Sequence, residues 1–164
     1  MLWNSLTIFR IYQICTVIFF ITALLACVYT DPVSTKQLNE NINASFSYIF
    51  LNNLKVACLL IFLGPVTFGL GTFTVLIINA LVLGGVFGSI KADLSLMRLL
   101  IPHGIIEIPI LLFAASIGVK LALNLLKLQI NIRLLLKHLV IVIIGLLVAA
   151  GIETLITPMF LKGV

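Results

Sequence analysis

Long apolar runs separated by short polar segments dominate this sequence. A transmembrane helix needs roughly 20 consecutive, mainly apolar residues. The stretch from Leu54 to Ile90 is nearly twice as long as a span, and glycines and one proline interrupt it at 64–71. These breaks predict a tight turn between two antiparallel spans. The pattern predicts an all-α, polytopic membrane protein, one integral membrane domain over residues 1–164, with about five transmembrane helices at about 11–29, 48–64, 72–90, 99–119 and 139–158.

The composition supports this prediction. Hydrophobic residues make up 62% of the 164 positions and charged residues only 9%, whereas soluble domains have about 25% charged residues. The net charge of +5 is spread along the chain and lacks interleaved aromatic residues, so nucleic acid is not an expected partner. Cys15, Cys27 and Cys58 lie in apolar runs without metal-binding spacing. We therefore expect no metal and no cofactor.

The distribution of basic residues predicts the orientation. The segment 120–138 carries four Lys or Arg residues and no acidic residue, whereas the loop 30–47 is net acidic. With five spans these segments fall on opposite sides, and basic loops favour the cytoplasm. The expectation is a multi-pass protein of the bacterial cell membrane with a cytoplasmic N-terminus and an external C-terminus.

Small residues recur four positions apart in three of the predicted spans. In lipid, such stripes allow helices to approach closely. They are therefore predicted to be the packing faces of the bundle. The stripes are Ala80, Gly84 and Gly88; Ala114, Gly118 and Ala122; and Gly145 and Ala149, followed on the same face by Glu153.

A polar stripe follows the fourth span. Lys120, Asn124, Lys127 and Asn131 recur at spacings of four, three and four, with leucines on the other faces. This pattern predicts an amphipathic helix that either rests on anionic lipid headgroups or docks a cytoplasmic partner protein. A second, smaller interfacial helix is predicted for 89–100.

Three ionisable residues fall inside predicted spans, where they are costly and often functional. His103 and Glu107 are four apart and share a helix face. A rise of 1.5 Å per residue places His103 roughly 6 Å and Glu107 about 12 Å from the outer end, and Glu153 about 9 Å from it. Asn52 and Asn53 start the second span on the same side. We therefore expect a polar layer in the outer half of the membrane.

This layer has three interpretations. His103 and Glu107 are candidate catalytic residues, acting as a general acid and base. A buried hydrogen-bonded cluster that sets helix register is the second interpretation. A metal site is the third, and it needs a further ligand such as Glu153. Pro102, Gly104 and Pro109 surround the pair, and the prolines predict a kinked or opened helix there.

The segment Pro102-His103-Gly104-Ile105-Ile106-Glu107-Ile108-Pro109 resembles the stage II sporulation protein M family. The resemblance covers about residues 50–122. It includes Asn52-Asn53 before the second span and Asn79 in the third, which adds Asn79 to the candidate polar cluster. Ile110 and Leu111 depart from the family pattern, which has Ala after the second proline.

Three functions are expected to compete, and the resemblance implies the first and the third of them. The first is a membrane subunit of a circular bacteriocin maturation and export complex, because short members accompany an ATP-binding protein in such gene clusters. Its expected partners are a hydrophobic peptide, the ATP-binding protein, other membrane subunits and lipids. A homo-oligomer is a further possible assembly. The second is an intramembrane peptidase or peptide cyclase using His103 and Glu107. The third is a non-catalytic scaffold of a sporulation engulfment complex.

Overall fold

The computed structural model describes the backbone of residues 7–32, 46–91 and 94–161, and the side chains of 7–32, 46–91 and 104–155. These residues form helices and no strand. The helices are α1 (Ile8–Tyr29), α2 (Phe46–Val66), α3 (Leu70–Ile90), α4 (Leu94–Leu126) and α5 (Ile132–Leu161). All five contain a segment long and apolar enough to cross a membrane. The predicted five-helix membrane fold is confirmed.

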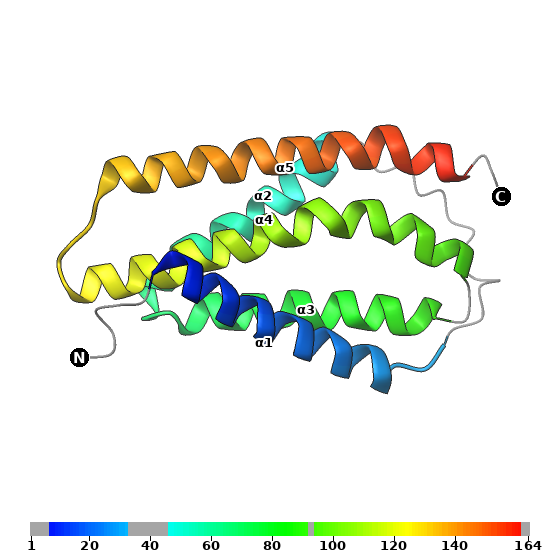
Figure 1. The fold of residues 1–164 in the computed structure, drawn as a ribbon, viewed down its shortest axis with the longest axis horizontal. Helices are drawn as coiled ribbons and strands as arrows, with labels where there is room; N and C mark the ends of the chain where they lie inside the picture. Colours follow the sequence, from blue (N-terminus) through cyan, green and yellow to red (C-terminus); the bar gives the residue numbers. More distant parts are fainter. Residues whose placement is uncertain (1–6, 33–45, 92–93, 162–164) are drawn as a thin grey trace.

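The helices form an elongated bundle (Figure 1). Helices α1, α3 and α5 run in one direction, and α2 and α4 run in the other. The turn between α4 and α5 therefore lies at the opposite end from the close of α1, as the five-span prediction requires. Which end faces the cytoplasm stays a prediction. Many large apolar side chains on the outside are exposed, for example Phe20 and Ile144, which suits a lipid-facing surface.

The predicted turn between the second and third spans is present. Helix α2 ends at Val66, and the backbone reverses through Phe68 and Gly69, which have positive φ angles of 54° and 94°. The amide of Gly69 donates a 2.7 Å hydrogen bond to the Gly64 carbonyl. A glycine suits position 69 because residues with a side chain rarely adopt this left-handed conformation.

Two predicted interfacial helices are not separate elements. Lys120 and Asn124 lie in the last turns of α4, and the chain turns at 127–130. Asn131 caps α5, where its Oδ1 accepts a 3.1 Å hydrogen bond from the Leu134 amide. Likewise, 89–100 is divided between the end of α3 and the start of α4. Lys120 and Asn124 belong to α4 because its apolar run continues to Leu126. Asn131 begins a new helix because asparagine is a favoured N-cap.

Helix α4 is continuous from Leu94 to Leu126, across Pro102, Gly104 and Pro109. The predicted opening of this helix is therefore absent from its backbone. A proline removes one intrahelical hydrogen bond, and neighbouring helices can compensate this loss in membrane proteins.

The small-residue stripes form the closest helix contacts, as predicted. A Cβ atom at Gly84 of α3 would overlap the carbonyl of Ala23 in α1, and one at Gly88 would lie 2.7 Å from the Cys27 carbonyl oxygen. Helices α1 and α3 thus form one parallel pair. Helices α2 and α4 form a second, where a Cβ at Gly64 would overlap the Gly118 carbonyl. These two pairs pack most extensively in the bundle. Close backbone approach is how helices gain van der Waals contact in lipid.

Candidate functional site

Two polar side chains lie buried in the middle of the bundle. Asn53 of α2 is 5% exposed and Glu107 of α4 is 8% exposed. The contact between Gly64 and Gly118 defines the register of these two parallel helices. Asn53 and Glu107 each lie eleven residues, or about three turns, before that contact. They therefore lie at the same level and on the stripes of the two helices that pack together.

Asn79 of α3 lies at this level too. The hydroxyl of Thr72 donates a buried 2.8 Å hydrogen bond to the Leu60 carbonyl oxygen, which joins the antiparallel helices α3 and α2. Asn79 is seven residues after Thr72, and Asn53 is seven residues before Leu60, so both lie two turns from this bond. The Nδ2 of Asn79 donates a 2.7 Å hydrogen bond to the Val75 carbonyl of its own helix.

Glu153 lies farther toward the end where α5 stops. Helices α4 and α5 are antiparallel, and a Cβ at Gly145 would overlap Ile110, which defines their register. By this register Glu153 lies five residues, or about 7.5 Å, beyond the level of Glu107. That is the level of the backbone at Pro102 and His103. Glu153 is half-buried.

The structure thus supports part of the predicted layer. Asn53, Asn79 and Glu107 come from three helices and share one level, which we call the polar layer. The predicted member Asn52 is exposed instead. The side chain of His103 lies outside the described residues. Among the described side chains, no three His, Cys, Asp or Glu residues gather as a potential metal site.

The amide of Asn53 has an uncommon environment. Its Nδ2 is buried and has no hydrogen-bond partner within the described part of the chain. A buried amide donor of this kind costs about 1–3 kcal/mol. This cost makes Asn53 a candidate functional residue of the polar layer.

An apolar cavity of about 550 Å³ lies between α1, α3 and α4. Gly104, Ile108 and Leu112 of α4 line it at helical spacing. Cys27 of α1 and Gly84 of α3 contribute to the other walls. We call it the apolar cavity. The sequence analysis did not predict it, because three apolar segments far apart in the chain form it.

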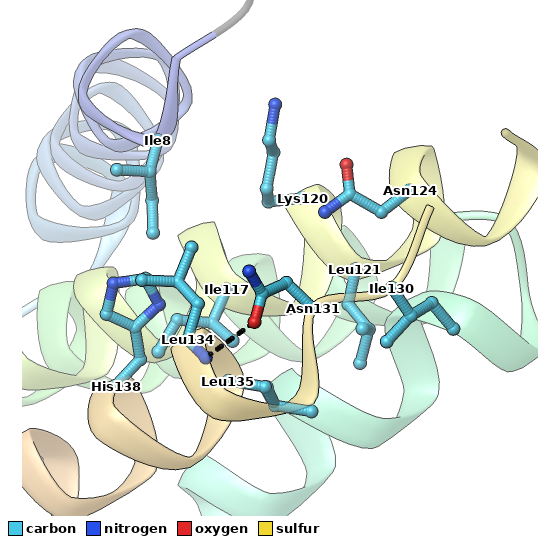
Figure 2. A pocket seen from close by; sticks show the side chains of 10 residues that line it. All are labelled: Ile8, Ile117, Lys120, Leu121, Asn124, Ile130, Asn131, Leu134, Leu135 and His138. Atoms are coloured by element: carbon cyan, nitrogen blue, oxygen red, sulfur yellow. Dashed lines mark hydrogen bonds between the residues drawn. The ribbon is translucent and has the colours of Figure 1, made fainter. Parts of the chain in front are cut away.

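A second cavity, of about 320 Å³, lies where the start of α1, the end of α4 and the start of α5 meet (Figure 2). We call it the polar cavity. Lys120, Asn124 and Asn131 line it, together with His138 and several leucines and isoleucines. Three of the four predicted stripe residues therefore share one cavity. Lys127 lies in the adjacent turn and does not line it.

His138 has a defined position in the polar cavity. Its ring packs edge-to-face against Phe113 of α4, with ring centroids 5.4 Å apart and an interplanar angle of 84°. Edge-to-face packing holds an aromatic ring in a specific orientation. The sequence analysis missed His138 as a functional candidate because it considered only ionisable groups deep in the membrane.

Fold and sites define an integral membrane protein with five apolar helices, two cavities and a buried polar layer. The chain belongs to the stage II sporulation protein M family, whose model matches residues 15–158. This confirms the family resemblance over a longer segment than the sequence motifs covered.

The similar proteins are archaeal. An uncharacterized protein of Methanocaldococcus jannaschii is 35% identical over 156 residues, covering 85% of this chain and 87% of its own length. A second uncharacterized protein of the same organism is 36% identical over 96 residues, covering 58% of this chain and 42% of its own. No solved structure matches the chain.

Proposed function

We propose that this chain is the membrane subunit of a peptide maturation and export complex, and that it holds a hydrophobic peptide of the circular bacteriocin type in the apolar cavity. The observation that carries this proposal is the apolar cavity between α1, α3 and α4. A bilayer-embedded cavity of this kind suits an apolar peptide helix, since the peptide reaches it through lipid without exposing its apolar side chains to water.

The small residues of the cavity support this role. Gly104 has no side chain and leaves space in the cavity that a larger residue would fill, whereas Gly84 allows the backbones of α3 and α1 to approach closely at the cavity wall. Helix association in lipid depends on close packing, because lipid already satisfies apolar side chains. A peptide with complementary bulky side chains therefore gains contacts here that lipid chains do not provide.

An ATP-binding partner would contact the end of the bundle with the α4–α5 turn. Arg133 and Lys137 are exposed there, and Lys127 lies beside them in the turn. Cationic groups in this arrangement favour an acidic protein surface. In cells that contain the partner, crosslinking from Lys127 is expected to capture the ATP-binding protein; capture of lipid alone contradicts this part of the proposal.

Photocrosslinking tests the peptide site directly. A photoreactive amino acid at position 108 is expected to capture a co-expressed circular bacteriocin, because Ile108 lines the apolar cavity. The same group at position 144 is the matched control, since Ile144 is an exposed apolar residue of α5. Equal capture at both positions would show that the peptide only dissolves in the surrounding lipid, and would exclude the site.

Filling the cavity provides a second test. Gly104→Leu is expected to reduce export of the peptide, whereas Gly151→Leu is the control because no atom of the described residues lies within 4 Å of a Cβ at that glycine. Membrane abundance of both variants is measured in parallel. Normal export by a well-expressed Gly104→Leu variant contradicts the proposed peptide site.

Catalysis at Glu107 is the second candidate function. The observation that favours it is the burial of a carboxyl group at membrane depth, at the level of two buried or half-buried asparagines. Glu107→Gln and His103→Gln are expected to abolish cyclised product while the complex still assembles. Loss of assembly in both variants assigns the polar layer a structural role instead.

A further inference from the structure

The polar cavity combines apolar walls with a cationic, hydrogen-bonding surface. Lys120 and Asn124 come from the last turns of α4, and Asn131 and His138 come from the start of α5 (Figure 2). Ile8 lies across from them at the start of α1. Ile117 lies about one turn nearer the membrane centre than Lys120, and the register of α4 and α5 places His138 at the same level.

The charge at this end of the bundle is strongly one-sided. None of the five acidic residues falls in the segments 7–15, 60–72 and 115–138 that form this end. Five of the ten basic residues do: Arg10, Lys120, Lys127, Arg133 and Lys137. The local field is therefore positive, and an anion in the polar cavity meets no carboxylate of the surrounding segments.

The donors fit a phosphate group. A lysine ammonium and the amide hydrogens of asparagine donate to phosphate oxygens, and hydrogen bonds to charged oxygens are about twice as strong as neutral ones. The Oδ1 of Asn131 is already used in the cap of α5, where it accepts from the Leu134 amide. This bond sets the orientation of the Asn131 side chain at the edge of the cavity. Packing against Phe113 does the same for His138.

We propose that the polar cavity binds the headgroup phosphate of an anionic phospholipid, with Lys120 as its main cationic contact. The membrane is the source of the phosphate because the cavity lies where spanning helices end, at headgroup depth, and because Ile117 and Leu134 offer apolar contacts for the upper acyl chain. A soluble anion would leave these apolar contacts unused. Lipid binding here does not depend on the peptide role of the apolar cavity.

Native mass spectrometry of the purified full-length chain tests this site. After exchange into detergent with phosphatidylglycerol or phosphatidylcholine, the wild-type chain is expected to retain phosphatidylglycerol selectively. Lys120→Gln is expected to weaken this retention about fivefold, the effect of one basic residue near an anionic membrane surface. Lys137→Gln is the matched control, because Lys137 is an exposed cation of the same end that does not line the cavity.

Four further results decide the proposal. Lys120→Arg is expected to keep the selectivity, and Leu121→Trp, which fills the cavity without changing charge, is expected to lose it. An equal loss in Lys137→Gln would show general surface attraction and overturn the site. Displacement of the lipid by millimolar inorganic phosphate would identify a soluble-anion site and also overturn it. Because the readout is bound lipid, its failure is distinct from failure of peptide export.

Discussion

Gly118 of α4 lies so close to the carbonyl oxygen of Leu60 in α2 that a Cβ atom would overlap it. The same oxygen accepts the hydrogen bond of Thr72 from α3. Three helices therefore meet around one carbonyl group, and this meeting point determines the level at which Asn53, Asn79 and Glu107 lie. Gly118 and Thr72 are therefore expected to contribute to the stability of this junction.

Gly118→Ala is expected to destabilise the protein by about 1–3 kcal/mol, the usual cost of forcing extra volume into a packed interface. The added methyl group would meet the Leu60 carbonyl and the Thr72 hydroxyl. Gly151→Ala is the control, because within the described part of the chain a Cβ there meets no atom closer than 4 Å. Thermal unfolding in detergent measures both. Equal melting temperatures for the two variants would contradict the close contact.

Thr72→Val is expected to lower the free energy of unfolding by about 1 kcal/mol, because it keeps the shape of the side chain but removes the bond to Leu60. Thr74→Val removes a 3.0 Å bond to the Leu70 carbonyl within the same helix, at an exposed position. Its effect is expected to be smaller. A larger effect at Thr74 would show that the bond between helices does not contribute to stability.

Gly84→Ala is expected to loosen α1 from α3, because α1 packs most extensively on α3 and the new methyl group would overlap the Ala23 carbonyl. Hydrogen exchange of the α1 amides should become faster. The neighbouring Gly85→Ala is the control, since its nearest neighbour would be the Thr30 hydroxyl at 3.9 Å. Unchanged exchange in Gly84→Ala would count against close packing of this pair.

Asn53→Leu is expected to raise the melting temperature, because it replaces a buried amide whose Nδ2 has no hydrogen-bond partner among the described residues. The gain is about 1–3 kcal/mol. Asn79→Leu is the control and should give no gain, since it removes an amide that bonds to Val75. A lower melting temperature of Asn53→Leu would contradict this prediction. If Asn53 contributes to peptide export, the stabilised variant will also lose export.

The five-helix membrane fold could be predicted from the sequence because the requirement is local. A bilayer requires long apolar runs, and each run satisfies its backbone groups within its own helix. The turn at Gly69 was predictable for a similar reason, since glycine favours positive φ. The small-residue stripes around Gly84 and Gly118 also indicated correctly which helix faces pack.

The helix partners could not be predicted in this way. The sequence does not show that Gly84 meets Ala23, or that Gly118 meets Leu60, because small-residue faces fit many partners equally well by composition. The two interfacial helices were predicted wrongly. Lys120 and Asn124 have the same four-residue spacing at the end of a long spanning helix as they would have in a separate interfacial helix. Only the capping bond of Asn131 shows where α5 begins.

By itself, the sequence determined a five-span membrane protein, its family and the polar residues inside its helices, since these follow from apolar length and local motifs. The tertiary structure decided that α1 pairs with α3 and α2 with α4, that Asn52 lies outside the polar layer, and that two cavities form between helices. The physical reason is that in lipid every apolar face is equally well solvated. Partner choice therefore depends on close fit between segments far apart in the chain.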